Sequence, residues 1–244
     1  MAKLLLLVKG ELTRLHKYKV THVSIALLVI WFLLLFFIED EVVLGQLLPF
    51  IIMVDATMMS ILFVGSILFF EKSEQTLSTI LVTPTSNHAK ILSKVIANTI
   101  QMLLSSVLLV LIFYFVKGIE VRFLSIILLL ALSIFSHSLI GFLFSYWSKS
   151  FTSMLMLVMS YSFIFMIPSA LFQFKIFFEA DFWQYVLLIS PTQSITYLIE
   201  FGLGKPFDMI TLIALLWMIT FSILLYIFVV YPKYKPYAVK QSGV

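Results

Sequence analysis

The chain has 244 residues, of which 62% are hydrophobic and 11% charged, and its mean hydropathy is +1.12. A soluble domain of this size needs more charge to cover its surface, so the composition favours a chain whose outer surface contacts lipid. The absence of Cys excludes disulfides, a thiol nucleophile and Cys-ligated metals. The net charge is +4, but the basic residues lie beside the apolar runs, where they set the topology rather than form a nucleic-acid-binding patch.

Residues 2–19 carry the pattern of an amphipathic helix. Four apolar residues recur at helical spacing in this segment: Leu5, Val8, Leu12 and Leu15. Basic residues lie elsewhere around the same helix, so we expect it to rest in the membrane interface, held by apolar burial and by anionic headgroups. The alternative is a basic flank that only sets the topology.

Six stretches are long and apolar enough to cross a hydrocarbon core of roughly 30 Å, which takes about 20 helical residues. They are residues 20–38, 47–70, 95–116, 123–147, 151–172 and 209–231. Each must be helical, because a lone strand in lipid leaves its backbone polar groups unpaired. The expected fold class is therefore an all-α integral membrane protein, with one transmembrane domain over residues 1–244.

An even number of spans places both termini on one side of the membrane. Twelve of the sixteen basic residues fall on that side: Lys3, Lys9, Arg14, Lys17, Lys19, Lys72, Lys90, Lys94, Lys149, Lys233, Lys235 and Lys240. The other four are Lys117, Arg122, Lys175 and Lys205. Because Lys and Arg gather in cytoplasmic loops, the bias predicts cytoplasmic termini.

The cytoplasmic link 71–94 is longer than a turn between two spans requires. It opens with a polar run and then places three apolar residues on one helical face: Leu77, Ile80 and Leu81. Pro84 disfavours helix at the residue before it, so we expect a short helix within 71–83 that stops near residue 82. Either Thr83 or Ser86 is expected to cap the helix that enters the third span.

The outer segment 173–208 is far longer than a simple connection. Ser190-Pro191-Thr192-Gln193 has the order of a capping box with Pro at the first helical position. An apolar face follows, and Gly202 and Gly204 are expected to end this helix. We therefore predict two short helices that dip into the outer interface before the last span.

Asp55 is the only acid inside a predicted span. An ionised carboxylate facing lipid costs several kcal/mol, so we expect Asp55 to face a cavity, a partner helix or water. A role in a substrate path and a structural, hydrogen-bonded role both remain open. The other substrate-path candidates are Met58, Met59 and Gln101, since methionines suit an adaptable apolar pocket.

A Ser136-His137-Ser138 run lies inside the fourth predicted span. We interpret it as a source of hydrogen bonds between helices, because no orienting carboxylate or nucleophile-elbow motif accompanies it. The four His residues are scattered without an H-E-x-x-H motif, which predicts no metal site.

The order of these parts resembles the ABC type-2 exporter permeases, whose interfacial elbow helix, coupling helix and re-entrant helices occupy the corresponding places. The best local match is Glu71-Lys72-Ser73-Glu74-Gln75-Thr76-Leu77-Ser78-Thr79-Ile80-Leu81-Val82-Thr83-Pro84-Thr85-Ser86, continuing to Lys94. Gln75 stands where the family usually has Gly. Ile189-Ser190-Pro191-Thr192 resembles the family's Pro before the last span, and Glu11-Leu12-Thr13-Arg14-Leu15 resembles its elbow.

The resemblance implies the transmembrane subunit of a bacterial ABC exporter, in the plasma membrane, that moves an amphiphilic or lipophilic substrate such as a drug, peptide or lipid-linked molecule. No G-x-x-x-x-G-K-[ST] motif occurs, so ATP and Mg are expected on a partner ATPase rather than on this chain, which is not itself an enzyme. A second permease copy, identical or different, is also implied. The residues implied in ATPase coupling are Glu71, Lys72, Ser73, Glu74, Gln75, Thr76, Leu77, Ile80, Leu81 and Pro84. Ser190 and Pro191 are implied in the outer re-entrant segment.

Two other functional classes fit the sequence less well than the exporter. An ion-coupled secondary transporter normally shows several intramembrane charges, broken helices and a repeated half, and only Asp55 fits that pattern. An intramembrane enzyme needs a catalytic constellation, which the sequence does not supply.

Overall fold

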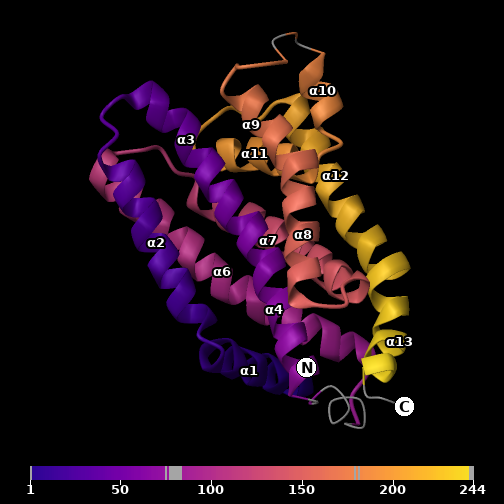
Figure 1. Cartoon of the computed structure of the whole chain (residues 1–244). Helices are drawn as coiled ribbons and strands as arrows, with labels where there is room; N and C mark the ends of the chain where they lie inside the picture. Colours follow the sequence, from indigo (N-terminus) through magenta and orange to yellow (C-terminus); the bar gives the residue numbers. More distant parts are fainter. Residues whose placement is uncertain (1, 75, 77–83, 179, 181, 242–244) are drawn as a thin grey trace.

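The structure is a computed structural model that describes residues 2–74, 76, 84–178, 180 and 182–241, and these residues form helices and turns without a strand (Figure 1). Five helical segments of the described chain are long and apolar enough to cross a membrane: Glu41–Lys72, Asn87–Lys117, Phe123–Trp147, Phe151–Gln173 and Met209–Val239. A sixth span is reached when the bent pair at the N-terminus is counted as one. The predicted all-α membrane fold is confirmed.

The bent pair consists of α1 (Ala2–Lys17) and α2 (Val20–Phe36), whose axes differ by 65°. Lys19 takes the left-handed conformation between them, with φ of 64°. α1 therefore lies across the end of the bundle while α2 runs along it (Figure 1). Leu15 is fully buried and Leu5 is exposed, so one face of α1 packs on the protein and another is free to meet lipid.

The second crossing is assembled from three consecutive elements: α3 (Glu41–Val54), the π-helical segment η1 (Asp55–Met59) and α4 (Ser60–Ser73). The Asp40 carboxylate accepts hydrogen bonds from the N–H groups of Val42 and Val43 and caps the start of α3. A π-helical turn widens the helix locally, and such turns recur at functional positions in helices.

α6 (Asn87–Lys117) begins eight residues before the start predicted for the third span. Ser86 caps it, as one of the two alternatives predicted, because its hydroxyl accepts from the N–H of Ala89 at 3.2 Å. Gly118, with φ of 66°, ends the helix in the left-handed conformation that glycine adopts without strain.

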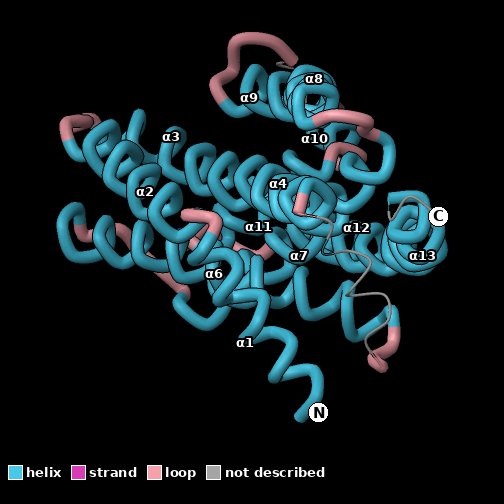
Figure 2. The backbone as a smooth tube through the Cα atoms, turned by 60° about the horizontal axis from the view of Figure 1, so that its bottom comes forward, coloured by secondary structure: helices cyan, strands magenta, loops and turns pink. Residues whose placement is uncertain are grey.

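α7 (Phe123–Trp147) is the central helix, packed against α4, α6, α11 and α12 (Figure 2). Gly141 allows α7 to approach α4 closely, since a Cβ atom at this position would lie 2.8 Å from the carbonyl oxygen of Ile61. This contact sets how closely α4 and α7 approach each other.

The fifth crossing comprises α8 (Phe151–Tyr161), the π-helical segment η2 (Ser162–Met166) and α9 (Ile167–Gln173). Pro168 lies in the first turn of α9, directly after η2, where its missing N–H is tolerated. Two short helices follow at the opposite end from α1: α10 (Trp183–Leu187) and α11 (Pro191–Gly202) (Figure 1). The chain ends with α12 (Met209–Leu225), η3 (Tyr226–Val230) and α13 (Tyr231–Gln241).

The capping box predicted at Ser190 is wrong in one respect. Pro191 is the first residue of α11, but the Ser190 hydroxyl makes no cap hydrogen bond. It instead bonds Thr192 at 2.8 Å and the carbonyl oxygen of Phe165 at 3.4 Å. That carbonyl also accepts from Ser169 and from Thr192. The Phe165 carbonyl in η2 thus competes with the α11 N-terminus for the hydroxyl.

Candidate functional site

Four charged side chains meet where α1, α4 and α6 pack together, and we call them the charge cluster: Glu11, Arg14, Glu71 and Lys94. The Lys94 ammonium donates to both carboxylate oxygens of Glu11, at 3.0 and 3.1 Å, and to Glu71 Oε1. Arg14 Nη1 lies 2.9 Å from Glu11 Oε1 and 2.9 Å from Glu71 Oε1. Two acids and two bases therefore form one connected, electrically neutral group.

The charge cluster is removed from water at its centre. The side chains of Glu71 and Lys94 are 0% and 3% exposed, whereas that of Arg14 is 37% exposed. Burial opposes the charge on Arg14, but the carboxylates of Glu11 and Glu71 outweigh it and raise the Arg14 pKa. Ion pairs this buried persist only when each charge keeps its partner, so the cluster holds the three helices in one arrangement.

The predicted coupling residues fall partly within the described chain. Glu74 accepts a hydrogen bond from the Tyr18 hydroxyl at 2.7 Å, and burial together with this bond raises the pKa of Tyr18 to about 12. The Thr76 hydroxyl donates to the Glu71 carbonyl at 3.2 Å, and Pro84 is exposed. Ser73 is the last residue of α4.

Lys72 lies outside the charge cluster, with its ammonium 3.4 Å from the carbonyl oxygen of Lys149. Four predicted coupling residues lie outside the described residues: Gln75, Leu77, Ile80 and Leu81. The role of segment 71–84 in coupling accordingly stays a prediction. What the structure adds is that the residues at both ends of the link are tied to α1.

Asp55 is buried in η1 and is held from two other helices. Trp31 of α2 donates its indole N–H to Oδ1 at 3.2 Å, and the Ser106 hydroxyl of α6 donates to Oδ2 at 3.1 Å. The carboxyl group is 3% exposed and thus faces partner helices rather than lipid. Trp31 and Ser106 were not singled out from the sequence, because neither has a local pattern that points to Asp55.

The other substrate-path candidates are not gathered around Asp55. Met58 is buried, and its sulfur lies 3.3 Å from the Ser162 hydroxyl of η2. Met59 is half-buried. Gln101 accepts a hydrogen bond from Thr21 at 3.2 Å, about one and a half turns of α6 away from Ser106. The path through these residues remains a proposal.

His137 is fully buried and forms hydrogen bonds of the kind expected between helices. Its Nε2 lies 2.8 Å from the Tyr161 hydroxyl of α8, and its Nδ1 lies 3.0 Å from the Ser133 carbonyl oxygen. The neighbouring Ser138 accepts from the Asn98 amide at 2.8 Å. Within the described ranges, no group of three or more His, Asp or Glu is placed to hold a metal ion.

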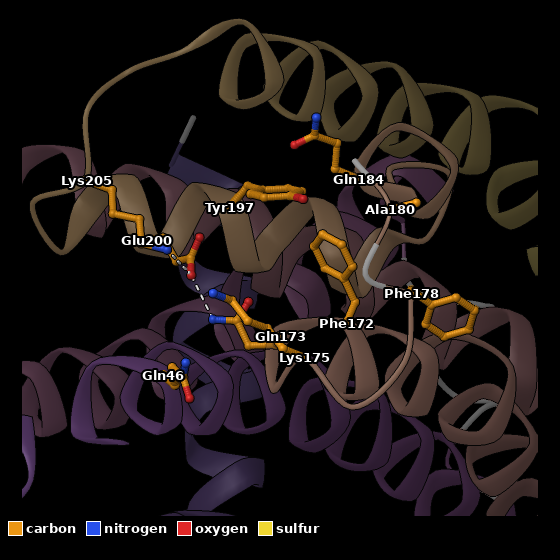
Figure 3. Close-up of a pocket in the computed structure, with 10 residues that line it drawn as sticks. All are labelled: Gln46, Phe172, Gln173, Lys175, Phe178, Ala180, Gln184, Tyr197, Glu200 and Lys205. Carbon is orange, nitrogen blue, oxygen red and sulfur yellow. Dashed lines mark hydrogen bonds and ion pairs between the residues drawn. The ribbon is translucent and has the colours of Figure 1, made fainter. Parts of the chain in front are cut away.

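A hollow of about 690 Å³ opens at the end of the bundle opposite α1 (Figure 3). The Glu200 carboxylate lies in its wall and accepts from Gln173 at 2.7 Å and from Lys205 at 2.6 Å. Tyr197 also lines it, and burial raises the pKa of this tyrosine to about 12. The Arg122 guanidinium closes the neighbouring end of α11 by donating to the carbonyl oxygen of Phe201 in its last turn and to those of Gly204 and Lys205 just beyond it.

One protein family matches most of this chain. The family described as ABC-2 type transporter matches residues 3–203, which extend from α1 through the end of α11. The chain belongs to the ABC-2 type transporter family. No curated protein matches the chain in a search for relatives.

Membership identifies the chain as the permease of an ABC transporter, which is a transport subunit without an ATPase of its own. Together with its long apolar helices, it makes the chain a multi-pass transmembrane protein. ABC-2 permeases work with an ATPase subunit, so the parts of this permease that face such a partner are the relevant functional surface.

Proposed function

We propose that this ABC-2 permease exports an amphiphilic or lipophilic substrate from the cytoplasm, driven by a separate ATPase subunit that binds ATP and Mg. Drugs, peptides and lipid-linked molecules are the substrate classes that fit an apolar route. The proposed location is the bacterial plasma membrane, and the positive-inside bias supports an orientation in which α1, the link 71–94 and α13 face the cytoplasm.

The charge cluster is the observation that supports this proposal most strongly. Glu71 lies at the start of the link and Lys94 at its end, and both bond residues of α1. A force applied to the link would therefore reach the second span, the third span and α1 together. If the ATPase binds this end differently with and without nucleotide, the difference in binding free energy shifts the permease between conformations.

The proposed substrate route passes the buried face of the second span. Asp55 there is the one acid that the sequence places within a predicted span, and its position in a π-helical segment supports a local role. Met58, three residues further along η1, supplies a polarizable apolar side chain to the proposed route. Asp55 accepts hydrogen bonds from two other helices, so these bonds would change if the helices move relative to one another when the permease changes conformation.

A second permease copy is proposed to complete the route. Only 17% of the apolar core of Phe151–Gln173 is buried, compared with 67% for α7. This exposed apolar surface suits lipid or a second copy, and the same surface would be costly in water.

The experiment that tests the coupling proposal replaces Leu77 and Ile80 with alanine and co-purifies the permease with its ABC ATPase. We expect the ATPase to be lost and export to fall to background, because these apolar side chains would fill the groove on the partner. The matched control removes two exposed apolar side chains from α7, Leu124 and Leu128, and should leave binding intact. Equal ATPase binding in the test and control variants would refute the proposal.

The energy source distinguishes the ATP-driven exporter from the alternative, an ion-coupled secondary transporter. If export continues with an ATPase whose P-loop lysine has been replaced, but stops when the proton or sodium gradient is collapsed, the permease is not driven by ATP. The exporter proposal predicts the opposite pair of results.

A further inference from the structure

Three lysines from different parts of the chain line one hollow of about 560 Å³ at the α1 end of the bundle. Lys72 comes from the end of α4, Lys149 from the turn after α7, and Lys233 from α13. None of the three is paired with an acid within the described ranges of the chain. Like charges gathered without a counter-charge repel one another, so this hollow favours an anion.

The wall of the hollow also supplies aromatic side chains. Trp147, at the end of α7, is 57% exposed, and the Lys233 ammonium lies 5.7 Å from its ring centre. Tyr146 and Tyr237 line the same hollow. Lysines beside an amphipathic indole are suited to a phosphate group at the membrane interface.

A second hollow, of about 480 Å³, adjoins the first and is lined almost wholly by apolar side chains. Trp147 lines both hollows and is their shared wall. From Trp147 the apolar groove follows α7 past Phe144 to Ile140, about two helical turns away. Its far wall is formed by η2 and α12, through Ile164 and Phe221 among others.

We infer that the two joined hollows bind one anionic phospholipid, with its phosphate among the three lysines and an acyl chain in the apolar groove. Charge complementarity selects an anionic headgroup, and the continuous apolar groove selects a molecule that carries a hydrocarbon chain. The positive-inside bias assigns this end to the cytoplasmic leaflet, where anionic headgroups are available. The site requires neither ATP hydrolysis nor the ATPase, so it stands or falls independently of the proposed coupling.

The test uses the purified, delipidated full chain titrated with dioleoylphosphatidylglycerol or dioleoylphosphatidylcholine, with bound lipid counted by native mass spectrometry. We expect the anionic lipid to bind more tightly. Each Lys→Gln replacement at positions 72, 149 and 233 should weaken it about fivefold, and the triple variant on the order of 100-fold. The charge-matched control is a triple Lys→Gln variant at Lys117, Lys175 and Lys205, which lie at the opposite end of the bundle, and it should retain the preference.

A second arm distinguishes a lipid from a soluble phosphate. Ser160, exposed at the edge of the apolar groove, is replaced by Trp to fill the groove without changing the charge. Phosphatidylglycerol binding should fall, while glycerol phosphate, which lacks acyl chains, should bind weakly to wild type and variant alike. Circular dichroism melting confirms that each variant is folded.

Three outcomes would overturn the inference. Equal affinity for the two lipids would show that no anion is selected, and an unchanged preference in the Lys72, Lys149 and Lys233 triple variant would show that the hollow is not the site. Glycerol phosphate binding as tightly as the lipid, with no effect of Ser160→Trp, would assign the lysines to a soluble phosphate. If the lysine variants lose the ATPase but bind lipid normally, the surface serves an acidic partner protein instead.

Discussion

Replacing Lys94 with methionine removes the cation that holds the centre of the charge cluster while keeping a similar apolar side-chain length. The Lys94 ammonium makes three contacts with carboxylate oxygens, two at 3.0 and 3.1 Å from Glu11 and one with Glu71. Only the half-exposed Arg14 then remains to face two carboxylates, one of them fully buried. Removing one partner from a buried ion pair costs about 3–5 kcal/mol, because a charge is left without compensation.

The assay is the apparent melting temperature of the purified permease in detergent, followed by circular dichroism. A loss of this size predicts a decrease on the order of 10 °C for a chain of this length. Lys17→Met is the matched control, because Lys17 is 69% exposed and lies 4.0 Å from Glu74, a geometry that contributes less than about 1 kcal/mol. A second variant, Glu71→Gln combined with Lys94→Met, should recover part of the loss. If Lys94→Met melts within a degree or two of wild type, the charge cluster does not hold the helices together.

Three further predictions concern other parts of the permease. Asp55→Asn should preserve the melting temperature but lower export, because the amide has the same size and can still form hydrogen bonds but carries no charge. Unchanged transport by this variant would exclude Asp55 from the substrate path. Gly141→Ala should destabilise the permease by about 1–3 kcal/mol by forcing α4 and α7 apart, whereas Gly45→Ala, which has open space around it, should be neutral or stabilising in the same melting assay. Asp208→Ala should cost about 1 kcal/mol through loss of the α12 cap. Hydrogen bonds from Thr211 lower the Asp208 pKa, so the stabilisation is present above the ordinary Asp pKa and is lost as the pH falls through the lowered value. The difference in melting temperature between wild type and Asp208→Ala should therefore shrink as the pH falls through this range.

The fold could be read from the sequence wherever the signal is carried by a run of similar residues. Long apolar stretches predict membrane helices because lipid tolerates no unpaired backbone groups, and local chemistry placed the Ser86 cap and Pro191 at the first position of α11. The interruption of the second crossing at Asp55 was not foreseen, since a π-helical turn has no short sequence signature.

The candidate site was predictable only in part, because its contacts join residues far apart in the chain. Glu71 was identified within a local motif, but its partners Arg14 and Lys94 are brought to it by the packing of α1 and α6. The Ser190 hydroxyl likewise bonds Phe165 rather than its own helix, since the π-helical segment η2 supplies a competing carbonyl acceptor. Charge and capping patterns therefore indicated which residues matter, whereas tertiary packing decided which partners they meet.

The measurement closest to the central claim is site-directed crosslinking between the permease and its ABC ATPase. Because the sequence contains no Cys, a single cysteine can be introduced at Thr76 in the link, or at Glu41 at the opposite end of the second crossing as the control. We predict that Thr76→Cys crosslinks to the ATPase, more strongly with nucleotide bound, and that the crosslink stops export, whereas Glu41→Cys is labelled only by reagents outside the cell. A Thr76→Cys variant that is labelled from outside and never reaches the ATPase would contradict the account.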